Sequence, residues 1–258
     1  MGKRKIFQEL SDDDLEFINN KMNNNENRYG GQINYAMIFD KATNYKINLK
    51  CKNIEQKEFL KTINENDITL CSAKSGVGKT YIAVSRALEL LQKDNSYRKI
   101  YLIKPAVEAG ETLGSLPGTL QEKLDPYMLS FYMVMDELIG SEYRKELMKN
   151  NIVEILGLGF LRGVNLKNCI VIADEMQNST STQMKTLLTR ISDGCKMIIM
   201  GDTNQIDNKV VNKKNSGLVT VINSLKDIDN IGIVDFKDAK SIRHPLIDII
   251  LNRLEKNE

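Results

Sequence analysis

The sequence predicts an α/β protein with a mostly parallel β-sheet and helices on both of its faces. Short apolar runs alternate along the chain with longer segments of helical spacing, which is the pattern of βαβ units. The runs at 169–173 and 196–200 are continuously apolar, as is typical of parallel strands buried on both faces. Polar motifs directly follow several of the runs, and parallel α/β sheets bind ligands at the carboxyl ends of their strands.

The composition is that of an ordinary globular protein. Of the 258 residues, 41% are hydrophobic and 27% are charged, which is enough for one large core. The net charge of +2 gives no global field that would favour nucleic acid, so any basic surface must be local. No apolar run is long enough to span a bilayer, and residues 1–9 lack a signal core. We therefore expect a cytoplasmic protein with no membrane partner.

Cysteine and histidine usage argues against a metal centre made of these residues. Cys51, Cys71, Cys169 and Cys195 all lie in or beside apolar runs, and no two of them form a CxxC pair. Reduced, buried thiols are the expected state. The single histidine, His244, argues against histidine-based catalysis.

The chain begins with segments that lead to a glycine motif. We expect residues 1–32 to form a variable, partly mobile extension that contains a helix over 11–25. We expect residues 33–258 to form one domain. Alternation at 47–51 predicts a short strand, and Asn53 is placed to cap the helix that follows it. An apolar strand at 67–71 then leads into the motif.

The remaining elements follow from the same periodicities. We expect further strands at 99–103, 152–155, 169–173, 196–200 and 231–234. We expect helices from residue 81, from about residue 120, through 128–138, and at 142–148, 180–190, 219–225 and 245–254.

The motif is the run Ser72-Ala73-Lys74-Ser75-Gly76-Val77-Gly78-Lys79-Thr80, between a strand and a helix. Strand, glycine loop and a Lys-Thr pair at the helix start make a P-loop, which binds the phosphates of ATP. Its glycines let backbone N–H groups turn inward around phosphate oxygens, and the helix N-terminus adds positive charge. The residues expected to bind nucleotide are Lys74, Ser75, Gly76, Val77, Gly78, Lys79, Thr80 and Tyr81.

Paired acids follow the buried strand at 169–173. In a P-loop protein, Asp174 at this position would hold Mg²⁺ together with the Thr80 hydroxyl, and Glu175 would polarise an attacking water. An isolated Asp-Glu pair is usually a solvated turn. The catalytic interpretation of Asp174 and Glu175 therefore depends on the presence of the P-loop in the same chain.

Three further polar residues are candidates for catalysis. Gln205 follows the strand at 196–200 and could bridge the γ-phosphate and the water, although a polar loop would have the same composition. Arg190 and Arg243 are candidates for an arginine that stabilises the transition state, with surface ion pairing as the alternative.

Motifs across residues 45–256 resemble the PhoH family. They are Lys104–Glu111, Leu116-Pro117-Gly118, Gln121-Glu122-Lys123, Asp125-Pro126-Tyr127, Phe160–Gly163, Asp174-Glu175 with Gln177-Asn178, Gln183-Met184-Lys185, Leu188–Ile191, Gly201-Asp202 with Gln205 and Asp207, Ser216-Gly217-Leu218, and Arg243-His244-Pro245. Two positions depart from the family pattern: Ala73 replaces a glycine, and Lys104 stands where arginine is usual.

The resemblance implies a RecA-like P-loop NTPase related to the first motor domain of superfamily 1 helicases. It implies a homo-hexameric ring, a link to RNA metabolism, and an adenine-reading glutamine at Gln56, for which a residue at the core edge of its helix is the alternative. An ATP-driven motor acting on RNA or single-stranded DNA is then one expectation, and a nucleotide-dependent binding switch without unwinding is the other. No aromatic and basic stacking platform is evident, and Lys209, Lys213 and Lys214 make only a modest basic loop.

Overall fold

The computed structural model describes residues 35–105, 120–161, 163–206 and 211–236, together with Leu246, Ile250 and Arg253. The chain divides into two units, Met1–Asn44 and Tyr45–Glu258. In the first unit the described element is helix α2 (Tyr35–Ala42). The helix predicted at 11–25 and the boundary predicted at residue 32 lie outside the described residues.

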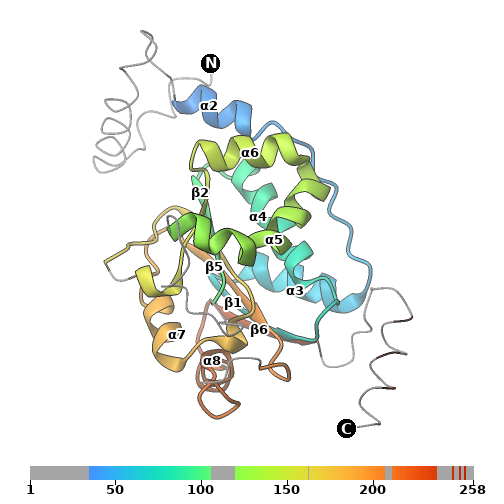
Figure 1. Ribbon diagram of the computed structural model, residues 1–258, viewed down its shortest axis with the longest axis vertical. Coiled ribbons are helices and arrows are strands. Elements are labelled where there is room, and N and C mark those ends of the chain that lie inside the picture. Colours follow the sequence, from blue (N-terminus) through green and yellow to red (C-terminus); the bar gives the residue numbers. More distant parts are fainter. Residues whose placement is uncertain are drawn as a thin grey trace. The chain divides into compact units, whose positions relative to one another are not determined.

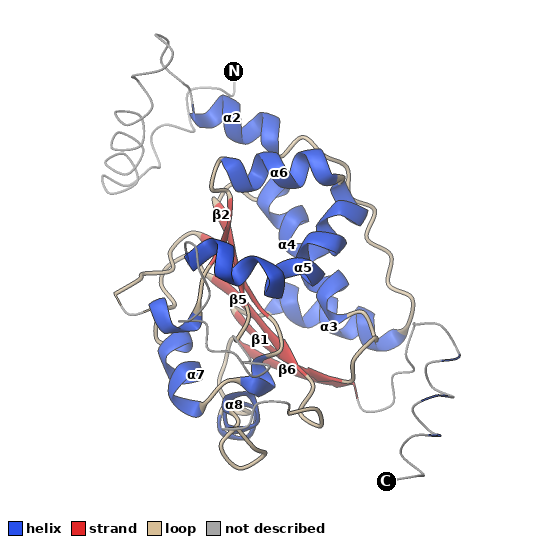
Figure 2. Ribbon diagram, viewed as in Figure 1, coloured by secondary structure: helices blue, strands red, loops and turns tan. Residues whose placement is uncertain are grey.

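The second unit is built on a parallel sheet of six strands in the order β3-β2-β4-β5-β1-β6, drawn as red arrows in Figure 2. The strands are β1 (Ile68–Ala73), β2 (Lys99–Ile103), β3 (Val153–Ile155), β4 (Cys169–Ala173), β5 (Lys196–Gly201) and β6 (Ile231–Phe236).

The strand order identifies the fold. Strand β5 lies between β1, which carries the glycine motif, and β4, which carries the paired acids. In register, Cys71 of β1 pairs with Met200 of β5, and Ala173 of β4 pairs with Ile199. The insertion of one strand between these two is the RecA-like arrangement of P-loop NTPases, so the predicted fold class is confirmed. It brings the polar ends of β1, β4 and β5 to one edge of the sheet.

Helices cover both faces of the sheet (Figure 1). One face carries α3 (Ile54–Glu65), α4 (Lys79–Lys93), α5 (Leu120–Ile139) and α6 (Ser141–Lys149). The other carries α7 (Ser181–Leu188) and α8 (Gly217–Ser224), with the 3₁₀ turns η3 (Leu158–Phe160) and η4 (Met176–Asn178). None of the helices in the described ranges combines the length and apolar character needed to cross a membrane.

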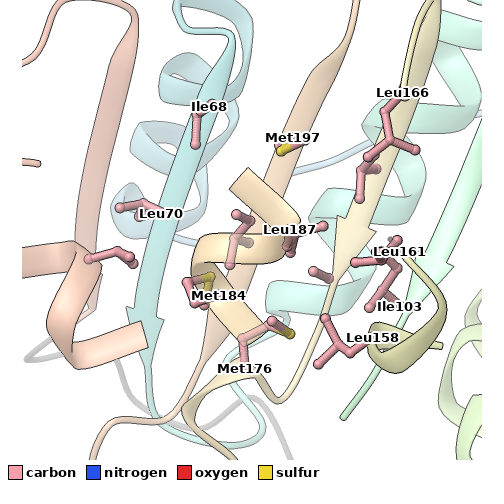
Figure 3. Close-up of a cluster of buried hydrophobic side chains, with 14 of the residues drawn as sticks. Ile68, Leu70, Ile103, Leu158, Leu161, Leu166, Met176, Met184, Leu187 and Met197 are labelled. Carbon is pink, nitrogen blue, oxygen red and sulfur yellow. The ribbon is translucent and has the colours of Figure 1, made fainter. Parts of the chain in front are cut away.

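Alternate residues of the strands supply the core beneath α7 (Figure 3). Ile68 and Leu70 of β1 and Met197 of β5 lie in one buried cluster with Met184 and Leu187 of α7. Side chains of successive strand residues point to opposite faces, so the intervening residues serve the α3–α4 side. Burial on both faces explains why β4 and β5 are continuously apolar.

Side-chain caps fix where two helices begin. The Asn53 side chain accepts a hydrogen bond from the Gln56 backbone N–H at 2.8 Å, which starts α3 as predicted. Thr180 and Gln183 form a reciprocal capping box that starts α7. Because the capping box fixes the start of α7, it also fixes the end of the short segment that contains η4 and follows the acidic motif.

Two predicted elements are wrong. Residues 47–51 form no strand: Ile47, Leu49 and Cys51 are half-buried along an extended segment that joins no ladder. The helices expected from residue 120 and through 128–138 are one helix, α5, which runs through Pro126. Proline removes one helical hydrogen bond, and burial of Leu124, Met128 and Phe131 on one stripe outweighs that loss.

Other predictions are settled only for the described residues. All four cysteines are free thiols, and Cys71, Cys169 and Cys195 are buried as expected, whereas Cys51 is half-exposed. The helix predicted at 245–254 falls mostly outside the described residues.

Candidate active site

The loop between β1 and α4 has the backbone that a phosphate cradle requires. Gly76 and Gly78 have φ values of 80° and 88°, in the left-handed region that favours glycine. Gly78 is the N-cap of α4, so Lys79 and Thr80 are the first helical residues. Backbone of this kind allows loop N–H groups and a helix N-terminus to bind phosphate oxygens together.

The Lys79 side chain folds back along this loop. Its Nζ donates hydrogen bonds of 2.6 Å to the Ala73 carbonyl and 2.9 Å to the Lys74 carbonyl. The residue is buried, so the ammonium charge sits inside the loop. A buried ammonium in this position stabilises anionic oxygens strongly, because the local dielectric constant is low.

Thr80 and Asp174 meet across the edge of the sheet. Thr80 Oγ1 donates a hydrogen bond of 2.8 Å to Asp174 Oδ2, joining the start of α4 to the end of β4. Asp174 is only 2% exposed. Burial raises the pKa of its carboxyl, and the Glu175 charge raises it further, while Lys104, the Thr80 hydrogen bond and Lys79 oppose that rise.

Lys104, the residue after β2, forms an ion pair with this carboxylate. Its Nζ lies 4.0 Å from Asp174 Oδ2, donates a hydrogen bond to Ser130 Oγ at 2.8 Å and sits 5.4 Å from the centre of the Phe131 ring. The position usually filled by arginine in the family thus holds a lysine that acts as a point charge. The sequence motif drew attention to Lys104. Its contact with Asp174, however, follows from the adjacency of β2 and β4 in the sheet, which the motif does not reveal.

Glu175 has an unusual backbone conformation. Its φ of 58° is left-handed, which is uncommon outside glycine and is found where surrounding structure holds a residue in place. Its Oε2 accepts a hydrogen bond of 2.8 Å from Gln177 Nε2. Gln177 is itself buried, so Glu175 is oriented by a fixed amide.

Gln56 lies against the P-loop from α3. Its Nε2 donates to the Val77 carbonyl at 2.9 Å, and its Oε1 accepts from the Lys52 backbone N–H at 2.7 Å. Both polar atoms of the amide thus already have protein partners, although the amide keeps a second N–H. Tyr81, in the first turn of α4, is half-buried, and burial raises the pKa of its phenol, as does the Glu137 carboxylate of α5.

Of the remaining predicted residues, Gln205 lies at the carboxyl edge of the sheet and Arg190 lies at the opposite edge. Gln205 follows β5 on an exposed turn whose backbone N–H bonds to the Asp202 carbonyl. The Arg190 carbonyl accepts from the Leu166 N–H, near the amino end of β4, so Arg190 lies at the opposite edge of the sheet from the P-loop. Arg243 is outside the described residues.

Asp202 is a residue whose place in the site sequence reasoning missed. It follows β5, is 4% exposed, and accepts a hydrogen bond of 3.1 Å from the backbone N–H of Ser75 in the P-loop. The signal was present, because a polar residue directly follows a buried strand of the same sheet. Its contact with Ser75 depends on β5 lying next to β1, which periodicity does not reveal.

The donor set fits a magnesium nucleotide. One hydroxyl, Thr80, and one carboxylate, Asp174, are the kind of sparse oxygen ligation that Mg²⁺ takes when phosphates and water complete its shell. The described residues contain no cluster of three or more His, Cys, Asp or Glu side chains that could hold a metal alone. A cation would thus depend on the nucleotide for its remaining ligands.

Comparison with known proteins identifies the family. A family model described as "PhoH-like protein" matches residues 48–255. The chain belongs to the PhoH family. It is 38% identical over 248 residues to a PhoH-like protein of Bacillus subtilis, covering 96% of this chain and 76% of that one. It is 38% identical over 210 residues to one of Synechocystis, covering 81% and 63%.

A third relative is more distant, and the chain is shorter than all three. Protein PhoH of Escherichia coli K12 is 33% identical over 198 residues, covering 76% of this chain and 55% of that protein. The chain thus spans between 55 and 76% of the lengths of these relatives. Membership supports an ATPase-type, nucleotide-binding protein.

Solved structures with related folds are far more distant in sequence. The large terminase of a thermophilic bacteriophage matches with a TM-score of 0.48 and 11% identity, over 80% of this chain and 50% of that one. The UvsW helicase of bacteriophage T4 matches with a TM-score of 0.42 and 13% identity, over 80% and 68%.

Proposed function

We propose that this PhoH-family chain hydrolyses ATP in a Mg²⁺-dependent reaction at the edge formed by β1, β4 and β5. One observation carries the proposal: the P-loop hydroxyl of Thr80 is hydrogen-bonded to Asp174, at 2.8 Å. These are the two side chains that a P-loop NTPase uses to hold its metal. Lys79 lies in the loop beside them and Glu175 is the next residue after Asp174, so binding and cleavage groups converge.

Each residue has a distinct part in the proposed reaction. The N–H groups from Ser75 to Thr80 bind phosphate oxygens, and Lys79 stabilises the charge that develops on the transferred phosphoryl group. Thr80 and Asp174 would hold Mg²⁺, which neutralises charge on the β- and γ-phosphates. Glu175, oriented by Gln177, accepts hydrogen bonds from the attacking water and polarises it.

The same proposal extends to partners. The family resemblance supports a homo-hexameric ring that couples hydrolysis to RNA or single-stranded DNA. The alternative is a switch that binds nucleic acid or protein in response to nucleotide without unwinding. The described part of the chain contains one sheet with one P-loop, so movement along a strand would need neighbouring subunits.

The ATPase rate of the full chain, measured with Mg²⁺ and with or without RNA or single-stranded DNA, tests this proposal. A rate that rises several-fold with one nucleic acid would support coupling. Hydrolysis indifferent to both would support the switch or another partner. No hydrolysis under any condition would contradict the assigned function.

A further inference from the structure

Lys104 and Asp174 are placed side by side by the register of the sheet. Ile103 of β2 pairs with Ala173 of β4, and the Asp174 backbone N–H donates to the Ile103 carbonyl at 2.9 Å. The two charged residues directly follow these paired positions. Their proximity is therefore fixed by the backbones of two adjacent strands.

One oxygen of Asp174 is approached by two groups from different elements. Lys104 Nζ lies 4.0 Å from Oδ2, and Thr80 Oγ1 donates to the same atom at 2.8 Å. The other oxygen, Oδ1, accepts from the Glu175 N–H at 3.0 Å. Because the proposed function assigns Thr80 and Asp174 to Mg²⁺, the ammonium of Lys104 stands beside the carboxylate oxygen closest to the other metal ligand.

A lysine ammonium and a metal ion would compete at this oxygen. Asp174 is buried and the Lys104 side chain is only 12% exposed, so water and salt screen the charges weakly. Two cations beside one carboxylate oxygen repel each other strongly in such surroundings. Binding of a divalent cation through Asp174 therefore favours movement of the ammonium away from it.

Lys104 has other partners on α5 that it can keep when it leaves Asp174. Its Nζ donates to Ser130 Oγ at 2.8 Å and lies 5.4 Å from the centre of the Phe131 ring. A hydroxyl oxygen and an aromatic face both stabilise an ammonium ion. The ammonium is thus held between a charged partner on one side and uncharged partners on the other.

We propose that Lys104 balances the charge of Asp174 until a magnesium nucleotide binds, and is then displaced towards Ser130 and Phe131. The inference deepens the proposed function and rests on it, since it concerns regulation of the same site. Lys104 acts through Asp174 and is a positioning residue. Because its ammonium competes with Mg²⁺ for the carboxylate, it raises the Mg²⁺ concentration that nucleotide binding requires. Its displacement also links the arrival of the metal to α5.

A lysine suits this exchange better than the arginine that is usual here in the family. Arginine binds a carboxylate through two parallel N–H groups, which holds the pair in one geometry. The ammonium of lysine is a point charge on a flexible stem, and its three donors can turn to a new partner. The departure of this chain from the family pattern at Lys104 therefore makes the cation easier to displace.

Lys104→Met tests the competition. Methionine keeps an unbranched apolar stem beside Phe131 and removes the charge. We expect the Mg²⁺ concentration that gives half-maximal binding of a fluorescent, non-hydrolysable ATP analogue to fall about fivefold or more. Lys104→Arg keeps the charge and should need at least as much Mg²⁺ as the wild type. Lys99→Met is the matched control, because it removes an ammonium at the other end of β2, where it pairs with Glu154, and should leave the requirement unchanged.

Ser130→Ala tests the exchange of partners and does not depend on the folding of the Lys104 variants. It removes the hydroxyl to which Lys104 donates, so the ammonium should stay with Asp174 and the Mg²⁺ requirement should rise. An unchanged or higher requirement in a folded Lys104→Met protein, or a requirement that does not rise in Ser130→Ala, would overturn the inference.

Thermal melting without nucleotide or Mg²⁺ separates this inference from the proposed function. Lys104→Met should then melt about 2 °C or more below the wild type, because the buried Asp174 carboxylate has lost its nearby cation. Lys104→Arg should melt close to the wild type. Equal melting of Lys104→Met and wild type would overturn the inference. A wild type that binds the ATP analogue under no condition would instead overturn the proposed function.

Discussion

Thr80 Oγ1 and Asp174 Oδ2 are joined by a hydrogen bond of 2.8 Å that connects the first turn of α4 with the carboxyl end of β4. The two residues are far apart in the sequence, and the fold makes them neighbours by placing β1 and β4 on either side of β5. The bond satisfies part of a buried carboxylate while leaving its other oxygen to the Glu175 N–H at 3.0 Å. The start of α4 and the end of β4 are therefore joined by the Asp174 carboxylate, whose burial costs folding free energy when it is ionised.

Asp174→Asn should stabilise the fold while it impairs activity. Burial raises the pKa of this carboxyl, so the ionised form costs folding free energy at neutral pH. Asparagine can keep its oxygen on the Glu175 N–H and donate from its amide to the Thr80 hydroxyl, so we expect a gain of about 0.5–2 kcal/mol, measured as a higher melting temperature. Sites that are strained for function commonly show this exchange between stability and activity.

The pH dependence of that gain has a definite sign. As pH rises above about 3.9, the unfolded carboxyl loses its proton first, so the unfolded state is increasingly favoured. The penalty is complete once the pH exceeds the raised pKa of the folded carboxyl. The difference in melting temperature between Asp174→Asn and wild type should therefore be small near pH 4 and large near pH 7. Equal differences at both values would show that Asp174 is not destabilising when ionised.

Glu175→Gln should keep nucleotide binding and lose cleavage. Glutamine has nearly the same shape, but it cannot polarise water as a carboxylate does, and loss of a general base typically costs about 10²-fold or more. Single-turnover phosphate release measures the chemical step, and calorimetry measures binding. Normal single-turnover release by this variant would assign water activation to another residue.

Gly201→Ala should lower both stability and turnover through Gln177. The added methyl would lie 2.3 Å from Gln177 Oε1, so the amide or the strand must shift. Overpacking typically costs about 1–3 kcal/mol. Gly159→Ala is the matched control, because a methyl added there would meet nothing within 4 Å and the φ of Gly159 is ordinary. Equal melting temperatures and rates for the two variants would contradict the closed packing around Gln177.

Arg190 should act on a neighbouring subunit if it acts in catalysis at all. It lies at the amino edge of the sheet, away from its own P-loop, and its Nε is buried without a hydrogen-bond partner in the described part of the chain. Mixing Lys79→Ala subunits with Arg190→Ala subunits should restore part of the ATPase rate, since some interfaces then pair an intact P-loop with an intact arginine.

The same mixing with Arg243→Ala tests the alternative arginine. Each parent protein should be inactive, and mass measurements must confirm that mixed rings form. Mixed rings without any recovery in either experiment would rule out a trans-acting arginine. A wild type that stays monomeric with ATP and Mg²⁺ while turning over fully would rule out the ring.

Local chemistry in the sequence was sufficient to predict the strand–loop–helix around Lys79 and the acids after β4, because each depends on neighbouring residues. The contacts of Asp202 with Ser75 and of Lys104 with Asp174 were not predictable, since both depend on which strands are adjacent. The strand predicted at 47–51 was wrong for a different reason. Alternating apolar and polar residues indicate that one side of a segment is buried. An extended segment that pairs with no strand has the same alternation.

Phosphate release from ATP by the full chain, compared with a Lys79→Ala protein purified in parallel, tests the central claim most directly. Lys79 places a buried ammonium in the phosphate cradle through bonds to Ala73 and Lys74, and no other P-loop side chain in the described structure supplies that interaction. We predict Mg²⁺-dependent hydrolysis by the wild type, and background release with weakened ATP binding by the variant. Near-normal turnover by Lys79→Ala would contradict the account.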